Sequence, residues 1–410
     1  MSTDGMDGWT RTTVADIASP AARSISIGPF GSNLRAEVYT ESGFPVLRGQ
    51  DITAQNELDT TSLVYVPVTV ARSFPGCIVR HGDLIFPHRG AIGRVGIVGH
   101  GEYLLSSSMM KLTCDRSKII PEYLFYYFRG PGKAELLMRS STVGTPGIAQ
   151  PLKSLREIPI AFPKIKQQRA IAGVLGALDD KITANIKLAY TVRTLANAEF
   201  DRAASNSPIE MALLDSAELV TRGITPSYTI ADSGVLVLNQ KCIRGQRVTL
   251  EPARLTDRTR LRQGKMLKMN DVLVNSTGQG TLGRVARWTT PGEATTDSHI
   301  SIVRFDASIV GPVCGGFALL RLQPIIEQMG EGSTGQTELS RAELGKLCLV
   351  LPNRSSQVAL ESQLVRMVEL EDSLWEQKTT LAATRDALLP YLMSGRLRVK
   401  DAEKIVSEAV

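Results

Sequence analysis

Residues 166–204 read KQQRAIAGVLGALDDKITANIKLAYTVRTLANAEFDRAA, and the architecture of the chain can be worked out from these residues. The apolar side chains recur every three or four residues, which is the spacing of one face of a long α-helix. They are Ile171, Leu175, Leu178, Ile182, Ala189, Val192 and Ala196. Asn185 interrupts the series with a polar side chain. The spacing predicts a helix of several turns with one continuous apolar face.

Residues 355–392 form a second segment of the same kind. Its apolar positions are Leu360, Leu364, Met367, Leu374, Leu381, Leu388 and Leu392. About 38 residues of helix span roughly 57 Å, which is longer than one globular domain requires. One interpretation is that each helix packs only on its own domain, as an ordinary amphipathic helix. The length and the spacing favour an antiparallel pair of long coiled-coil helices within the chain.

The chain also repeats itself at a period of about 190 residues. Five segments recur in the same order, at offsets of 188 to 191 residues. The pairs are Gly82–Ile85 (GDLI) with Asn270–Leu273 (NDVL), Gly93–Val95 with Gly283–Val285 (both GRV), Pro121 with Pro312, Thr142–Thr145 with Ser333–Gln336, and Pro163, followed by Gln167 and Gln168, with Pro352, followed by Gln357. Five ordered matches indicate a duplicated unit rather than unrelated domains that share turn residues.

Each repeat contains a mixed globular part followed by a long helix. In the first globular part, short β-branched segments bounded by Gly or Pro predict strands of a mainly antiparallel, curved sheet. These segments are Ser62–Thr69, Cys77–Arg80, Asp83–Phe86 and Arg94–Val98. Pro121 is expected to begin a helix that continues through Glu122–Arg129.

We therefore predict an α+β chain with two pseudo-symmetric domains, each built on a mixed, mainly antiparallel sheet. The antiparallel pair of long coiled-coil helices is expected to separate them. The predicted boundaries are residues 1–163 for the first globular domain, 164–204 for the central helix, 205–353 for the second globular domain, 354–394 for the C-terminal helix and 395–410 for a tail.

The composition is that of an ordinary globular protein, with 43% hydrophobic and 21% charged residues among 410. No run of 18 or more apolar residues predicts a membrane span, and the polar N-terminus is unlike a cleaved secretory signal. The five cysteines form no C-x-x-C pair, so we expect buried free thiols in a reducing cytoplasm rather than disulfides or zinc. They are Cys77, Cys114, Cys242, Cys314 and Cys348.

Basic residues cluster in the second globular part, although the net charge of +6 is a mild excess for this length. Residues 241–268 contain nine basic and two acidic side chains, which suits phosphate contacts and bidentate contacts with guanine. The basic residues are Lys241, Arg244, Arg247, Arg254, Arg258, Arg260, Arg262, Lys265 and Lys268. A solvated basic face is the alternative interpretation. In the first globular part the basic residues are sparser, at Arg72, Arg80, His81, His88, Arg89 and Arg94.

Motifs for catalysis are missing from the sequence. There is no G-x-x-x-x-G-K-[ST] loop, no G-x-S-x-G elbow and no H-E-x-x-H, and the four histidines lack metal-ligand spacing. Residues 278–283 (GQGTLG) match a dinucleotide-binding fingerprint formally. A strand-like segment, Arg284–Trp288, follows them where that fingerprint needs a helix, so a Gly-rich hairpin is the better interpretation. We expect no cofactor and no metal.

Several of these segments resemble a known family. Ile165–Ala172 (IKQQRAIA), continuing through Leu178–Ile182 (LDDKI), is similar to the central conserved region of type I restriction-modification specificity subunits. Gly28–Leu34 (GPFGSNL), Gly82–Phe86 (GDLIF) and Arg89–Arg94 (RGAIGR) resemble recurrent segments of that family's recognition domains. The lead-in to the second helix departs from the pattern, because Asn353–Gln357 (NRSSQ) replaces the usual basic Gln-Gln segment.

The resemblance implies a non-catalytic subunit with two target-recognition domains, each reading one half of a split, asymmetric site in double-stranded DNA. The two long helices would act as a spacer and as the docking surface for two DNA methyltransferase subunits, with restriction (motor-nuclease) subunits joining them. A self-contained methyltransferase or nuclease with unrecognised catalytic residues is the alternative of a different class. A third possibility, a coiled-coil scaffold that binds no nucleic acid, predicts no salt-dependent DNA affinity.

The candidate site residues follow from these arguments. For DNA contact they are Arg72, Arg80, His88, Arg89, Arg94, Lys241, Arg244, Arg247, Arg258, Arg260, Arg262, Lys265 and Arg284. For the helix and partner interface they are Ile171, Leu175, Leu178, Ile182, Leu364, Leu374 and Leu381. Arg94 and Arg284 could equally pair with carboxylates inside the fold.

Overall fold

The computed structural model describes residues 8–29, 34–141, 146–231, 233–329 and 338–409. The chain divides into two compact units, and the two long helices contribute residues to both. Unit 1 comprises Met1–Ala184 and Gln377–Val410, and unit 2 comprises Asn185–Glu376. The repeated segments Thr142–Thr145 and Ser333–Gln336 and part of the segment 28–34 lie outside the described residues.

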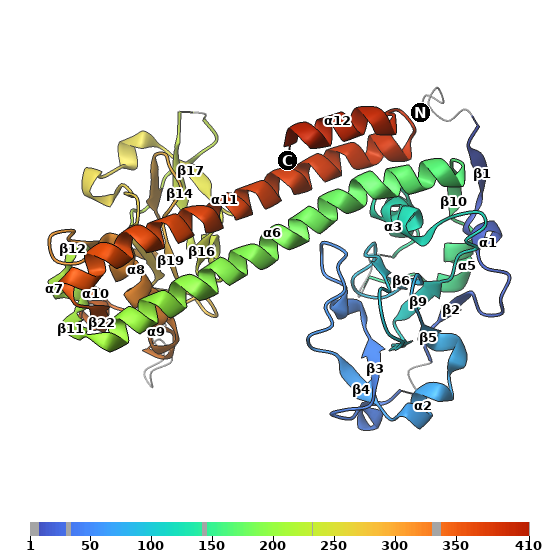
Figure 1. The fold of residues 1–410 in the computed structure, drawn as a ribbon, viewed down its shortest axis with the longest axis horizontal. Helices are drawn as coiled ribbons and strands as arrows, with labels where there is room; N and C mark the ends of the chain where they lie inside the picture. Colours follow the sequence, from blue (N-terminus) through green and yellow to red (C-terminus); the bar gives the residue numbers. More distant parts are fainter. Residues whose placement is uncertain (1–7, 30–33, 142–145, 232, 330–337, 410) are drawn as a thin grey trace. The chain divides into compact units, whose positions relative to one another are not determined.

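Unit 1 contains two four-stranded sheets, and both have short strands (Figure 1). One sheet is antiparallel, in the order β2-β9-β6-β7, and the other has the order β4-β3-β8-β5 with β3 and β8 parallel. The elements are β1 (Thr10–Thr13), α1 (Val14–Ile17), β2 (Ile25–Ile27), β3 (Phe44–Leu47), β4 (Val64–Val66), α2 (Val68–Arg72), β5 (Ile78–Val79), β6 (Leu84–Pro87), β7 (Gly96–Ile97), β8 (Tyr103–Leu105), β9 (Met109–Leu112), α3 (Pro121–Arg129), α4 (Pro131–Met138), α5 (Pro151–Arg156) and β10 (Pro159–Phe162).

Unit 2 repeats this plan. Its antiparallel sheet has the order β12-β21-β18-β19, and its mixed sheet has the order β13-β17-β14-β20 with β14 and β20 parallel. The elements are β11 (Pro208–Ala212), α7 (Leu213–Ser216), β12 (Ala217–Arg222), β13 (Tyr228–Thr229), β14 (Val235–Leu238), β15 (Ile243–Arg244), β16 (Arg247–Val248), β17 (Arg254–Thr256), β18 (Val272–Asn275), β19 (Val285–Arg287), β20 (Ala294–Thr296), β21 (Ile300–Phe305), α8 (Pro312–Arg321), α9 (Gln323–Met329), α10 (Arg341–Gly345) and β22 (Cys348–Pro352).

The predicted long helices are α6 (Ile165–Asn206) and α11 (Arg354–Met393), and a shorter helix, α12 (Val399–Ala409), follows them (Figure 1). With 42 and 40 residues, α6 and α11 span about 63 and 60 Å. Within unit 1, Asp179 of α6 accepts a hydrogen bond from Arg385 of α11. Within unit 2, Arg193 of α6 pairs with Glu371 of α11. The order of these contacts along each helix shows that the two helices run antiparallel, as predicted.

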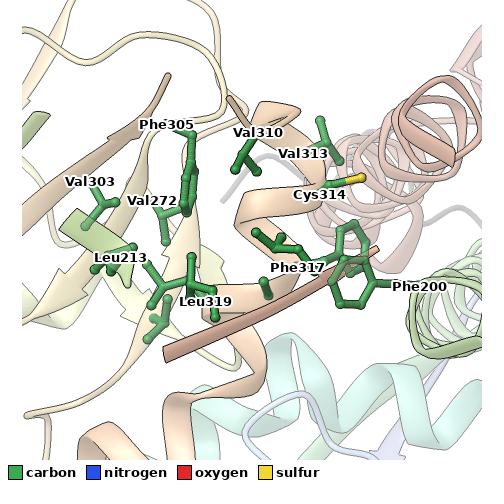
Figure 2. Packing of buried hydrophobic residues seen from close by; sticks show 14 of the residues in the cluster. Phe200, Leu213, Val272, Val303, Phe305, Val310, Val313, Cys314, Phe317 and Leu319 are labelled. Carbon is green, nitrogen blue, oxygen red and sulfur yellow. The ribbon is translucent and has the colours of Figure 1, made fainter. Parts of the chain in front are cut away.

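The core of unit 2 lies between its antiparallel sheet and the two long helices. Helix α8 occupies this position, and its Phe317 stacks on Phe200 of α6 with ring centroids 5.9 Å apart (Figure 2). Val272 and Phe305 of the sheet and Leu364 of α11 belong to the same buried cluster. Each long helix therefore packs on a globular part as well as on the other long helix. Both interpretations of its apolar periodicity apply.

The expected strands and helices are present, and most of the strands are shorter than predicted. The segments Ser62–Thr69 and Arg94–Val98 contain strands of three and two residues, β4 and β7. Helices α3 and α8 begin at Pro121 and Pro312, as predicted. Strand β19 follows the Gly-rich segment 278–283, as predicted, where a dinucleotide fingerprint would need a helix.

The expectation for the cysteines needs correction. All five are free, and Cys114, Cys242 and Cys314 are buried. Cys77 is only half-buried and Cys348 is exposed, because Cys348 begins the two-stranded β11–β22 sheet, in which alternate side chains face solvent. None of the described helices has the length and apolar character needed to cross a lipid bilayer.

Candidate functional site

A polar groove of about 470 Å³ opens on unit 1 where three loops meet. The loops follow β3, follow β6 and connect β8 to β9. The lining residues are Tyr39, Arg48, Gly49, Gln50, Arg89, Gly90, Ala91, Arg94, Ser106, Ser107 and Ser108. Three arginines, a glutamine and three serines offer donors and acceptors suited to phosphate oxygens and base edges.

Backbone hydrogen bonds hold the three loops together. Ser106 N donates to Leu47 O at 2.9 Å, which joins the β8–β9 loop to the end of β3. His88 N donates to Ser108 O at 2.9 Å, which joins the loop after β6 to the same connection. Because these bonds involve only the main chain, they do not constrain which side chains face the groove.

Unit 2 has the same frame. Asp297 N donates to Leu238 O at 2.8 Å, and Ser276 N donates to His299 O at 2.9 Å. These bonds match those of Ser106 and His88 in the first unit. The equivalent surface of unit 2 therefore consists of residues 239–242, 276–284 and 297–299.

A glycine in each unit supports this frame from behind. Gly28 N donates to Met109 O, and Gly223 N donates to Ile300 O. A Cβ at Gly28 would overlap the Ser106 carbonyl oxygen, and a Cβ at Gly223 would overlap the carbonyl oxygens of Thr296 and Asp297. Only glycine allows this close approach of two backbones, which gives a physical reason for Gly28 in the recurrent segment 28–34.

Buried glutamines dock the long helices in the same way in both units. Gln168 Nε2 donates to Pro163 O at 2.8 Å, and its Oε1 accepts from Ile120 N at 2.9 Å, just before α3. Gln357 Nε2 donates to Pro352 O at 2.8 Å, and its Oε1 accepts from Gly311 N at 3.1 Å, just before α8. The second of the two glutamines after Pro163 is thus the counterpart of Gln357.

The predicted cations of unit 1 have different environments. Arg89 is exposed and lies in the groove. Arg94 also lines the groove, but its Nη1 donates to Ile52 O at 2.7 Å and so braces the loop after β3. Arg72 and Arg80 both pair with Glu102, at 2.9 and 2.7 Å.

His88 is buried, with 6% of its surface exposed, and its Nε2 lies 3.0 Å from Ser107 O. Burial lowers the pKa of the His88 imidazole below its ordinary value, and the bond to Ser107 O opposes this in part. The buried His88 side chain therefore supports the wall of the groove, whereas the neighbouring Arg89 side chain is exposed in the groove.

In unit 2, Lys241 and Arg244 are exposed, and Lys241 lies in the loop equivalent to the one that carries Gln50. Arg284 repeats the role of Arg94: its Nη1 donates to Ile243 O at 3.4 Å, and its Nη2 donates to Gly280 O at 2.9 Å. The expected alternative for Arg94 and Arg284 was pairing with carboxylates. The observed acceptors are backbone carbonyls instead.

Arg247 is held against α11. Its Nη1 donates to Glu371 at 3.0 Å and to Asp372 at 3.4 Å, and its guanidinium lies 4.7 Å from the centre of the Trp375 ring. Burial lowers the pKa of Arg247, whereas the neighbouring carboxylates raise it. Arg247 thus joins the β15–β16 hairpin to the long helix.

The remaining predicted cations lie on two exposed turns. Arg258 pairs with Glu293 at 2.6 Å, and Arg260 and Arg262 are exposed with no ion-pair partner among the described residues. Lys265 is half-buried and donates from Nζ to Gly223 O at 2.7 Å. The basic run of residues 241–268 is therefore divided between the groove surface, α11 and these turns.

Four further residues lie near these surfaces and were not predicted from the sequence. Arg48 and Gln50 line the groove of unit 1. Arg222 and Arg341 lie beside Lys265 and the 297–299 loop of unit 2. Alignment of the two repeats would have placed Gln50 opposite Lys241, but no local pattern distinguishes Arg222 or Arg341.

All seven residues predicted for the helix interface are buried: Ile171, Leu175, Leu178, Ile182, Leu364, Leu374 and Leu381. Leu374 packs with Ala189 and Val192 of α6, which is a helix-to-helix contact. Leu364 belongs to the core cluster of unit 2. Within the described ranges, no three His, Cys, Asp or Glu side chains are grouped so as to hold a metal ion.

Comparison with known proteins gives concordant matches. Residues 39–189 match the family described as the type I restriction modification DNA specificity domain. The type I restriction enzyme MjaX specificity subunit of Methanocaldococcus jannaschii is 21% identical over 387 residues, which cover 87% of this chain and 88% of that protein. The crystal structure of a type I restriction-modification S subunit from M. genitalium has a TM-score of 0.62 at 14% identity, covering 94% of this chain and 96% of that one. The structural likeness shows that the fold is shared.

Proposed function

The chain belongs to the family of type I restriction-modification specificity subunits, and from this premise we propose that it recognises a bipartite, asymmetric DNA site. As a member of this family it is a non-catalytic DNA-recognition subunit. We assign one half of the site to each globular domain, residues 1–163 and 205–353. The groove of unit 1 and its counterpart in unit 2 are the proposed reading surfaces.

One observation carries this proposal: the two units share a groove frame but present different side chains on it. Arg89 of unit 1 corresponds to Thr277 of unit 2. Arg89 directly follows His88, whose N–H binds the 106–108 loop, and Thr277 directly follows Ser276, whose N–H binds the 297–299 loop. The same backbone geometry can therefore approach DNA twice, while different donors and acceptors select different bases.

The candidate contacts take different roles within this proposal. Arg89, Lys241 and Arg244 are exposed and can reach base edges, where arginine and lysine bind guanine O6 and N7. Arg258, Arg260 and Arg262 suit contacts with the phosphate backbone. Arg94, Arg284 and His88 support the loops, and Arg72, Arg80 and Arg247 are held by carboxylates. We assign these six an indirect part in binding.

Partners follow from membership of the family. A specificity subunit directs DNA methyltransferase and restriction subunits to its site. We propose that α6 and α11 serve as the spacer between the recognition domains and as the docking surface for two methyltransferase subunits. The complex would act on DNA in the cytoplasm.

Methylome sequencing of a host that carries this chain with its methyltransferase subunit tests the proposal. We expect one asymmetric motif, with two specified halves separated by unspecified bases. The variant Arg89→Thr introduces the unit 2 residue into unit 1, and we expect it to change one half of the motif. The reciprocal Thr277→Arg should change the other half.

Lys346→Ala is the matched control, because Lys346 is an exposed cation of unit 2 outside the groove loops. It should leave both halves unchanged. A continuous, undivided motif would contradict the two-reader proposal. A variant in one groove that altered both halves would contradict the assignment of one reader to each half.

A further inference from the structure

Four basic residues of unit 2 gather beside its 297–299 loop although they come from three separate segments. Arg222 ends β12, Arg262 precedes a short 3-10 turn (Gln263–Lys265) that Lys265 ends, and Arg341 begins α10. Arg262 and Lys265 belong to the basic run of residues 241–268, whereas no local pattern places Arg222 or Arg341 beside them. We name these four residues the basic cluster.

Hydrogen bonds bring the three segments together. Lys265 Nζ donates to Gly223 O, next to Arg222, at 2.7 Å. Arg222 Nη2 donates to Leu339 O at 2.7 Å, two residues before Arg341. Arg222 Nη1 donates to Ser298 O at 3.1 Å, so the basic cluster adjoins a loop of the groove.

The cluster is poorly neutralised within the described part of the chain. Burial lowers the pKa of Lys265, and the positive charges of Arg341 and Arg262 lower it further. The carboxylate paired with the cluster is Glu338, 3.0 Å from Arg222. Among the described residues, these four cations and the one carboxylate paired with them form a surface that favours an anion with several oxygen atoms.

The fold does not require these charges, because unit 1 lacks them at the corresponding positions. Ile27 precedes Gly28 where Arg222 precedes Gly223. Phe74 precedes the equivalent 3-10 turn (Pro75–Cys77) and Cys77 ends it. Pro151 begins α5 where Arg341 begins α10. The cations near this turn in the described part of unit 1 include Arg23, whose side chain lies against Gly76, and the buried Lys111, whose Nζ donates to Ile78 O.

We propose that the basic cluster binds phosphate groups of the DNA backbone next to the half-site read by unit 2. This inference rests on the proposed function and adds that the two units contribute differently to the binding energy. Unit 2 anchors the DNA electrostatically, whereas unit 1 relies more on its groove. Phosphate contacts position a protein on the duplex and do not select bases, so the cluster should act on every DNA sequence alike.

The test measures the affinity of the full chain for two duplexes over a range of salt concentrations. One duplex contains the motif found by methylome sequencing, and the other contains a scrambled sequence. The variants are Arg262→Gln/Arg341→Gln, which keeps the Lys265 anchor, and the same pair with Lys265→Gln. Hydrogen exchange of β18 and β21 verifies that unit 2 remains folded.

Each lost phosphate contact should lower the slope of log affinity against log salt by about 0.9. We expect the double variant to lose about two slope units and the triple variant up to about three. At about 0.1 M salt, affinity for both duplexes should fall roughly 10- to 100-fold. The matched controls, Lys346→Gln/Arg366→Gln and that pair with Lys187→Gln, remove the same charge from other exposed positions and should keep the slope.

The outcomes separate this inference from the proposed function. An unchanged slope in the double and triple variants would overturn the phosphate site, while discrimination between the two duplexes would still uphold the function. A wild-type chain that binds both duplexes equally would refute the function, whereas a reduced slope in the variants would still support the phosphate site. Loss of methyltransferase assembly with an unchanged slope would assign the cluster to a protein partner and overturn the inference.

Discussion

The two globular units carry different side chains at positions where their backbone hydrogen bonds match. The main-chain bonds of the 106–108 loop recur at 297–299, yet Ser106 is replaced by Asp297 and Ser108 by His299. The short 3-10 turn that follows β3 in unit 1 has Gln50 at its middle position, and the turn that follows β14 in unit 2 has Lys241 there. This fold therefore keeps the groove frame in the main chain, which leaves the groove side chains free to differ.

A second difference lies beneath the frame. Asp83 accepts hydrogen bonds from Arg80 N at 2.8 Å and from the Thr113 hydroxyl at 2.5 Å. Its counterpart Asp271 accepts from Lys268 N at 2.8 Å and also binds the buried Arg304 guanidinium in a bidentate pair, at 2.8 and 2.6 Å. The same structural position thus accepts a hydroxyl hydrogen bond in unit 1, where the nearby buried Lys111 donates to Ile78 O instead, and forms a buried bidentate ion pair in unit 2.

The largest expected effect comes from this buried pair. Asp271→Ala should destabilise unit 2 by about 3–5 kcal/mol, because Arg304 would remain buried without its carboxylate. Asp83→Ala should cost unit 1 only about 1–3 kcal/mol, since a hydroxyl and a backbone N–H lose a partner. Hydrogen exchange of β18 and β6 reads the two units separately. Equal losses of stability in the two units would contradict this difference between them. The double variant Asp271→Ala/Arg304→Met should recover much of the stability of unit 2.

The shared frame should make the two packed glycines equally sensitive. Gly28→Ala and Gly223→Ala should each destabilise their own unit by about 2–3 kcal/mol, because the added Cβ overlaps backbone carbonyl oxygens. Gly99→Ala and Gly264→Ala are the matched controls, since a Cβ at either position meets nothing within 4 Å. Thermal unfolding and hydrogen exchange measure the effect. A mild effect at either packed position would show that the two frames are not equivalent.

The helix-docking glutamines should show a slightly smaller effect. Gln168→Ala and Gln357→Ala each leave buried backbone groups unsatisfied, which should cost about 1–3 kcal/mol. Gln168 makes three such bonds and Gln357 makes two, so the loss should be larger in unit 1. Urea unfolding of each variant tests this order. The exposed Gln167→Ala is the control and should leave the unfolding curve in place.

The smallest expected effect is a difference in acid sensitivity. Burial lowers the pKa of His88 in the folded state and so favours its neutral form. In the unfolded chain the same imidazole takes up a proton near pH 6.5. Its contribution to stability is therefore complete above pH 6.5 and is lost progressively as the pH falls from that value through the lower pKa of the folded state. Ser276 occupies the equivalent position in unit 2 and cannot titrate in this range. Hydrogen exchange at pH 7 and pH 5.5, corrected for intrinsic rates, should reveal selective loosening of the 88–94 loop, and His88→Gln should abolish the selectivity.

Much of the fold can be predicted from local patterns in the sequence. The apolar periodicity located α6 and α11 to within one or two residues at each end. The repeat located equivalent turns: Gly82 and Asn270, the paired first residues of GDLI and NDVL, both adopt positive φ, at 86° and 69°. Periodicity and turn chemistry are properties of neighbouring residues, so a single chain displays them directly.

The roles of individual cations depended on the tertiary structure. Arg94 and Arg284 looked like candidates for DNA contact or for ion pairs, but they donate to backbone carbonyls about 40 residues away, and carbonyl acceptors leave no signal in a sequence. Arg247 belonged to a basic run, yet two carboxylates more than 120 residues away hold it. Arg222 and Arg341 come close only because strand β12 and helix α10 pack together. Local pattern thus specified where the helices, strands and turns lie, whereas long-range approach of the main chain decided which side chains remain available to a ligand.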